Sequence, residues 1–127
     1  MADRLYTSVL SDEILSGLRF ETKLEKYVLA RIAFSVSIAV DGKNVPRSTD
    51  FSGPEMKRPT FIGSDELFFK TVLSFVHGIK ELSEDEFYSN KSLIKDHIDN
   101  GSKHLTTMFD ESNKDAEIFL KKITDMV

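Results

Sequence analysis

The sequence contains no cysteine and no tryptophan, and only three prolines and six glycines among its 127 residues. Without cysteine the chain has no disulfide, no thiolate nucleophile and no carrier for a persulfide. It also lacks thiolate ligands for zinc or for an iron–sulfur cluster. Any sulfur or redox chemistry in which the protein takes part must therefore be carried out by another molecule.

Long apolar runs and an excess of basic residues are absent as well. No apolar segment approaches the roughly 20 residues that a membrane-spanning helix requires, and residues 1–4 do not resemble a secretory signal. We therefore expect a cytoplasmic protein that does not bind membranes. The formal net charge is −4, from 17 basic and 21 acidic residues. The total field does not attract a polyanion, so DNA binding would require a local basic patch.

The apolar content is sufficient for one compact core. Hydrophobic residues make up 40% of the chain, and ten of them are phenylalanine, which is typical of a globular protein of this length. We expect a single domain over residues 1–127. Its patterns predict a mainly α-helical fold with about five helices and a short N-terminal β-strand.

The N-terminal region predicts a strand followed by two helices. Residues 4–10 contain several strand formers with apolar side chains at alternating positions. Ser11, which precedes two acidic residues, is typical of a helix N-cap. A second helix follows Thr22, and only Arg31 is charged in its segment 28–40. A helix this apolar is buried by its own domain or by another copy of the chain.

Arg31 is the most informative single residue of the second helix. A guanidinium within an apolar helix must find a carboxylate or backbone carbonyls, because an unpaired buried charge is costly. We favour a buried ion pair with Asp65 or Glu66 over ligand binding.

The middle of the chain predicts irregular structure and then shorter helices. All three prolines lie in the stretch 41–59, which is long for a structureless loop and is either pinned to the surface or an interaction element. The pattern of residues 60–63 predicts a short extended segment. A third helix begins near Asp65 and ends at Gly78.

The C-terminal part predicts three further helices. Ser83 with Glu86 three residues later forms a capping box that opens a short acidic helix. A longer helix begins after Ser92 and runs to about Phe109, and residues 116–123 form a terminal amphipathic helix.

No catalytic or metal-binding motif is present. The glycine-rich phosphate motifs and the nucleophile elbow are all missing. The histidines are His77, His97 and His104, and none has the spacing of a metal pair; His97 fits a core histidine better than a ligand. The acidic run 81–86 lacks the spacing of a calcium loop. We expect no catalytic residue, no metal and no cofactor.

Basic residues gather in two short stretches that are candidates for contact with nucleic acid. Lysine and arginine provide sequence-independent affinity for phosphates. The alternative is ordinary solvated surface, because acidic residues are interleaved with them. The candidates are Arg4, Arg19, Lys23 and Lys26 in the first stretch, and Lys57 and Arg58 in the second.

Three blocks of the sequence are informative when they are taken together. They are YVLARIAFSVSI at 27–38, FIGSDELF at 61–68, and HIDNG at 97–101, which is followed by Leu105. Each block is mostly apolar, but in order and spacing the three resemble the DndE family of bacterial DNA phosphorothioation proteins. The resemblance covers about residues 4–106 and leaves 107–127 as a C-terminal helical extension.

The resemblance implies a small helical protein with a ribbon-helix-helix-like start that assembles into a tetramer. It implies a role beside a cysteine desulfurase, an iron–sulfur sulfurtransferase and an ATPase when sulfur replaces an oxygen of the DNA backbone. It also implies binding of DNA, preferentially nicked duplex, without an active site. We expect a non-catalytic, homo-oligomeric subunit that assists the sulfur-transfer complex on DNA. The alternative is a protein–protein adaptor of the same machinery that does not contact DNA.

Overall fold

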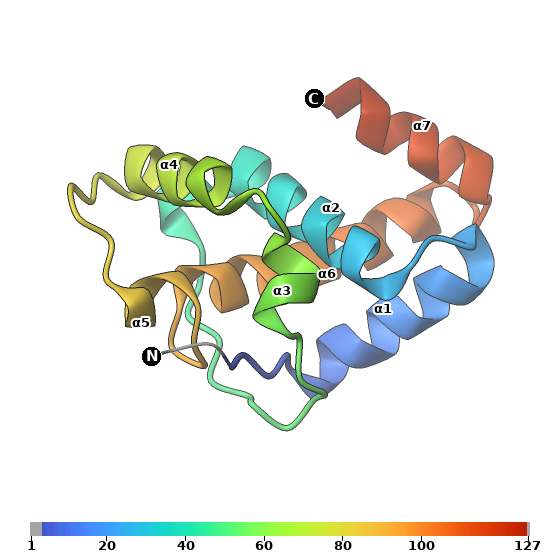
Figure 1. Ribbon diagram of the computed structural model, residues 1–127. Helices are drawn as coiled ribbons and strands as arrows, with labels where there is room; N and C mark the ends of the chain where they lie inside the picture. Colours follow the sequence, from blue (N-terminus) through green and yellow to red (C-terminus); the bar gives the residue numbers. More distant parts are fainter. Residues whose placement is uncertain (1–3, 127) are drawn as a thin grey trace.

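The computed structural model describes residues 4–126 and is mainly helical, as predicted (Figure 1). In this part of the chain, no helix is both long and apolar enough to cross a membrane. The elements are α1 (Val9–Thr22), α2 (Lys26–Val40), the 3-10 helix η1 (Gly42–Asn44), α3 (Arg58–Ile62), α4 (Glu66–His77), α5 (Glu84–Phe87), α6 (Leu93–Glu111) and α7 (Ala116–Met126).

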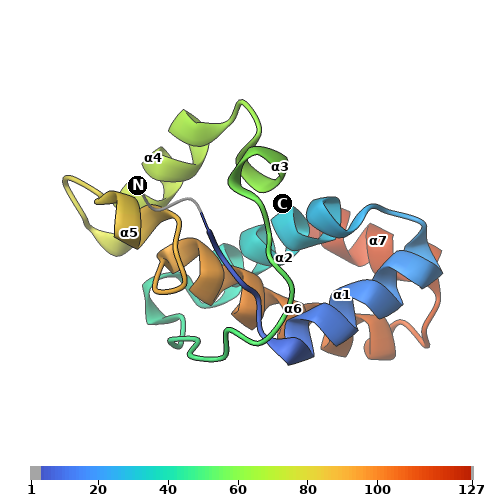
Figure 2. The ribbon, with the colours of Figure 1, turned by 60° about the horizontal axis from the view of Figure 1, so that its bottom comes forward.

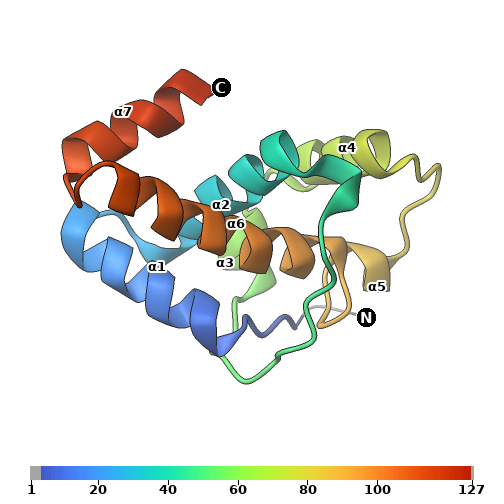
Figure 3. The same ribbon diagram turned by 180° about the vertical axis from the view of Figure 1, so that it is seen from behind.

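Helices α2 and α6 lie against each other at the centre of the molecule (Figures 1 and 3). Gly101 of α6 permits their close approach, because a Cβ atom built there would lie 1.7 Å from the carbonyl oxygen of Ala33 in α2. All residues from Ser92 to Ser102 are buried. The strongly apolar α2 is thus buried largely by its own chain, although Ser35 and Ala39 on one side remain exposed.

Phe34 of α2 is the centre of the aromatic core. Its ring meets Phe61 of α3, Phe69 of α4 and His97 of α6 edge-on, at centroid distances of 6.4, 5.2 and 5.6 Å. Edge-to-face geometry places the positive rim of one ring against the negative face of another. These contacts join α2 to α3, α4 and α6, which all follow it at least 17 residues later in the sequence.

The predicted N-terminal strand is wrong. Residues 4–126 contain no β-strand, only an isolated antiparallel bridge between Tyr6 and Glu55. Figure 2 shows the N-terminal segment beside the connection that leads to α3. The pairing stops because Ser8 caps α1 there: its hydroxyl accepts from the backbone N–H of Ser11 at 3.0 Å. The helix therefore begins two residues before Ser11, and the ribbon-helix-helix-like start lacks its strand.

Residues 60–63 also differ from the prediction, because they belong to α3 and to its C-terminal Gly63 rather than to an extended piece. Pro59 sits in the first turn of this helix, where a missing N–H costs nothing. With α3, the described part of the chain has seven α-helices instead of about five. The predicted helix end at Gly78, in the left-handed conformation with φ of 64°, and the capping box of Ser83 and Glu86 are confirmed.

The proline-containing connection between η1 and α3 is pinned to the helices, one of the two predicted alternatives. Its anchor is a buried ion pair on α6, in which Nζ of Lys95 donates to Asp99 at 2.6 Å and to the carbonyl of Asp50 at 2.6 Å. Asp99 also accepts from the N–H of Ser8 at 3.1 Å and from the hydroxyl of Ser11 at 2.7 Å. One carboxylate therefore holds α1, α6 and the connection together.

The final helix, α7, packs across the end of α6. The ring of Phe119 is fully buried and meets Phe109 edge-on at 5.4 Å. The turn before α7 places Asn113 and Lys114 at positive φ, 55° and 57°. In Figure 1, α7 and α4 stand on opposite sides of α2.

Candidate nucleic-acid interface

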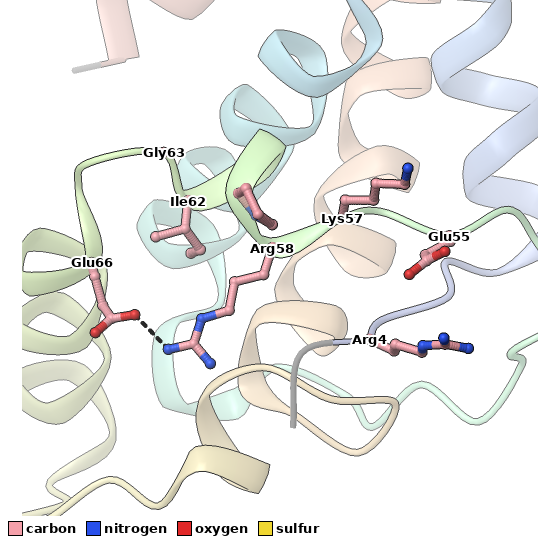
Figure 4. A pocket seen from close by; sticks show the side chains of 8 residues that line it. Arg4, Glu55, Lys57, Arg58, Ile62, Gly63 and Glu66 are labelled. Carbon is pink, nitrogen blue, oxygen red and sulfur yellow. Dashed lines mark hydrogen bonds and ion pairs between the residues drawn. The ribbon is translucent and has the colours of Figure 1, made fainter. Parts of the chain in front are cut away.

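A surface hollow of about 540 Å³ brings three of the predicted basic residues together (Figure 4). Arg4 comes from the N-terminal segment, and Lys57 and Arg58 come from the start of α3. The bridge between Tyr6 and Glu55 places these two segments side by side. The remaining lining residues are Glu55, Pro59, Ile62, Gly63 and Glu66.

A second, smaller hollow of about 280 Å³ continues the same surface. It shares Glu55 and Lys57 with the first hollow and adds Lys26 from the start of α2, next to Glu25. The structure therefore places Arg4, Lys57 and Lys26 along one face, which we call the basic strip. Carboxylates line both hollows, so the strip is not a region of uniform positive potential.

Arg58 lines this site but is held in ion pairs within the protein. Its side chain is 12% exposed and forms ion pairs with Glu66 and, at 2.6 Å, with Glu84. The guanidinium also lies over the ring of Phe87, 5.0 Å from its centroid. Its hydrogen bonds hold the pKa of both glutamates below the usual range. Figure 4 shows Arg58 directed toward Glu66, whereas Lys57 and Arg4 point elsewhere.

The basic residues near the junction of α1 and α2 are partly neutralised. Lys26 forms an ion pair with Asp12, and Arg19 lies 3.7 Å from Glu25. Lys23 occupies the left-handed C-cap of α1, with its ammonium 4.9 Å from the ring centroid of Phe20. The exposed pair of Arg19 with Glu25 contributes little to stability, and the pair of Lys26 with Asp12 is partly exposed.

Three predicted cations form no ion pair with a carboxylate of residues 4–126, namely Arg4, Lys23 and Lys57. All three are exposed. They are the residues whose charge is most available to an external anion, since no carboxylate has to be displaced first.

Arg31 pairs with Asp65, one of the two predicted carboxylates, but the pair is not buried as predicted. Its Nε donates to the carbonyl of Phe61 at 2.7 Å and its Nη2 to that of Ile62 at 3.0 Å, so it caps the C-terminal end of α3. Nη1 lies 3.4 Å from Asp65, and both side chains of this pair are partly exposed rather than buried. Glu66 belongs to the Arg58 pair instead. The carbonyls of α3 attract the cation because they form the negative end of that helix.

A contact between the buried His97 and the partly exposed His77 was not predicted. Nε2 of His97 lies 2.8 Å from Nε2 of His77, and Nδ1 of His97 lies 2.7 Å from the hydroxyl of Ser37. Burial, assisted by His77, lowers the pKa of His97 to about 4. Local spacing contains no signal for this pair, because its members are twenty residues apart. Among residues 4–126 no group of three or more metal-ligating side chains is assembled.

Comparison with known proteins gives two findings. The family model described as DNA sulphur modification protein DndE matches residues 4–113. The fold is similar to the crystal structure of DndE from Escherichia coli B7A, a protein described as involved in DNA phosphorothioation modification. That similarity has a TM-score of 0.58 and 21% sequence identity, and it covers 83% of this chain and 99% of the other. Comparison with curated protein sequences gives no significant match.

Proposed function

The chain belongs to the DndE family of DNA sulphur modification proteins, and from this premise we propose that it is a non-catalytic, homo-oligomeric subunit of a phosphorothioation system. In this role it engages DNA, including nicked duplex, and assists the sulfurtransferase and ATPase subunits. It acts in the cytoplasm as a single domain without a cofactor.

The observation that carries this proposal is a sulfur-modification family match in a chain that contains no cysteine. A persulfide carrier and an iron–sulfur cluster both depend on thiolates in most proteins. The chain cannot carry the sulfur as a persulfide, so a contribution to phosphorothioation consists of binding and positioning. The proposal therefore assigns the chemistry to other subunits.

The surface used for DNA is proposed to combine the basic strip with Lys23. Arg4, Lys57 and Lys23 supply the charge, and Lys26 contributes when its pair with Asp12 opens. Arg58 supports the strip by fixing α3 against α4 and α5. Three to four phosphate contacts predict a slope of about −3 in a plot of log affinity against log salt concentration.

The experiment is fluorescence anisotropy of nicked and intact duplex at several salt concentrations. Lys57→Glu and Lys23→Glu each reverse one charge of the proposed surface, and Lys121→Glu on α7 is the matched control, because Lys121 is exposed and lies outside it. We expect the first two variants to weaken binding by about tenfold or more and the control to bind normally. Equal losses in all three variants would show that only net charge matters.

A second function, that of an adaptor which does not touch DNA, is favoured by the net charge of −4 and by the carboxylates beside the strip. Its test is co-purification with the sulfurtransferase or ATPase subunit. Binding to a subunit by protein that shows no salt-dependent DNA binding would establish the adaptor. A chain that binds neither DNA nor a subunit would exclude both functions.

A further inference from the structure

One face of α4 is apolar and exposed. The side chains of Leu67, Phe68 and Phe75 are 80%, 61% and 88% exposed, and Thr71 between them is exposed as well. Residues four apart lie above one another on a helix, so Leu67, Thr71 and Phe75 form one line along the surface. We call Leu67, Phe68, Thr71 and Phe75 the α4 stripe. A contiguous apolar patch of this kind marks an interaction site.

The fold holds this face outward. On the opposite side of α4, Phe69 and Leu73 are buried in the core, and the last residue, His77, is hydrogen-bonded to His97 of α6. Rotating the helix to bury the stripe would break these contacts. Helix α4 lies at the periphery in Figures 1 and 3, with no other helix drawn over its outer side.

The charges around the stripe indicate the chemistry of its partner. None of its four residues is charged, and the nearest charged residues of α4, Glu66 and Lys70, are paired with each other at 3.3 Å. Lys70 is also paired with Glu84 at 3.3 Å. A phosphate backbone or an anionic membrane surface requires free cations, which the stripe does not offer. An uncharged apolar surface matches it.

We propose that the α4 stripe packs antiparallel against the same stripe of a second copy of this chain, about a two-fold axis at Thr71. The pattern is self-complementary, because Leu67 and Phe75 lie at equal distances on either side of Thr71. Antiparallel pairing places Leu67 of each copy against the partner's Phe75, and the small Thr71 permits close approach at the crossing point. A two-fold interface requires such self-complementarity.

The area of the stripe is adequate for this contact. With about 200 Å² for each phenylalanine, the exposed parts of the three large side chains amount to about 450 Å² per copy. If the pair covers these side chains completely, they contribute about 900 Å², and Thr71 and the flanks must supply the rest of the roughly 1,000–1,200 Å² of a specific interface. This inference rests on the proposed homo-oligomer and names the surface that forms it.

The first test uses the absence of cysteine from the chain. In Thr71→Cys, two thiols meet at the proposed axis, so mild oxidation of the full-length protein should yield a disulfide-linked dimer in most of the sample. Thr107→Cys is the matched control, since Thr107 is an exposed threonine on α6. Equal cross-linking in both variants, or none in Thr71→Cys, would overturn the proposed axis.

The second test measures mass by light scattering for Leu67→Lys, Phe75→Glu and the double variant. Because each change occurs twice in a two-fold pair, we expect each single variant to raise the dissociation constant by at least about 100-fold. The double variant should recover association, because each lysine then faces the partner's glutamate. Phe20→Glu on α1, at a phenylalanine that is 72% exposed, should keep the wild-type mass.

The outcomes separate this inference from the proposed function. A monomeric wild-type protein at about 100 μM, or a Phe75→Glu protein of unchanged mass, would refute α4 pairing. DNA binding is measured on the same samples. Wild-type protein that does not bind DNA would refute the DNA-binding function, whether the protein is a monomer or an oligomer. Circular dichroism shows whether a variant is folded, and an unfolded Phe75→Glu leaves Leu67→Lys and Thr71→Cys as the deciding variants.

Discussion

Gly101→Ala is the most stringent test of the packing between α2 and α6. The new methyl group would lie 1.7 Å from the carbonyl oxygen of Ala33, 2.3 Å from its carbonyl carbon and 2.8 Å from its Cα. Ordinary contacts of a Cβ atom begin near 3.4 Å. The obstacle is backbone within a helix, so no side chain can rotate away, and the two helices must move apart by more than 1 Å.

Two opposing effects decide the magnitude. Glycine is less favourable than alanine in a helix interior by about 1 kcal/mol, so the substitution alone would stabilise α6. Overpacking a core costs about 1–3 kcal/mol and occasionally more, and separation of α2 from α6 also loosens the contacts around it. Because the overlap is with backbone, we expect a cost of about 4 kcal/mol, above the usual range for overpacking, and therefore a net loss of about 3 kcal/mol in the free energy of unfolding.

Gly17→Ala is the matched control. Gly17 lies within α1, and no atom lies within 4 Å of a Cβ built there. This substitution should raise the free energy of unfolding by about 0.5–1 kcal/mol, because only the helix propensity changes. The assay is urea denaturation followed by circular dichroism at 222 nm. A Gly101→Ala protein as stable as Gly17→Ala would refute the close approach of α2 and α6.

Three further predictions concern buried polar groups. Asp99→Ala leaves the buried ammonium of Lys95 without its carboxylate and should lower the free energy of unfolding by about 3–5 kcal/mol, measured in urea. The pKa of His97 is lowered to about 4 in the folded chain, so at pH 5 this histidine is protonated in the unfolded chain but not in the folded chain. Stability should therefore fall by about 2 kcal/mol between pH 7.5 and pH 5, and less steeply in His97→Gln, as urea midpoints will show. Arg58→Ala should lower the unfolding temperature because two ion pairs are lost, whereas Lys57→Ala, at an exposed side chain, should leave it within about 2 °C.

The parts of the fold that were predicted correctly depend on local signals. The capping box of Ser83 and Glu86 and the left-handed Gly78 act within a single helical turn, so the sequence around them determines the structure. The N-terminal strand failed because a strand requires a partner. Its partner segment contributes one bridge at Glu55 before Ser8 starts α1. Pro59 was interpreted as part of an irregular stretch, although the first turn of a helix accepts it.

The candidate site could be predicted only in part, for the same reason. Composition identified the basic residues, but the availability of each charge depends on contacts made across the fold. Arg58 is held by Glu84, which is 26 residues away, and Lys26 by Asp12, which lies in another helix. No local pattern reports such pairs. Sequence reasoning therefore treated Arg58 and Lys57 as equals, whereas the structure separates a structural arginine from an exposed lysine.

The blocks that carry the family resemblance meet in space as packing contacts. Gly101 of the third block lies against Ala33 of the first, and Phe61 of the second meets Phe34 of the first. Arg4, Lys23 and Lys57, which offer the available charge, lie outside all three blocks. The family resemblance therefore rests on residues of the helical scaffold, whereas the proposed binding of DNA rests on surface residues outside the three blocks. We therefore expect Lys57→Glu to lower the affinity for DNA and to leave the free energy of unfolding unchanged. Gly101→Ala should lower the free energy of unfolding and leave the DNA affinity of the folded protein unchanged.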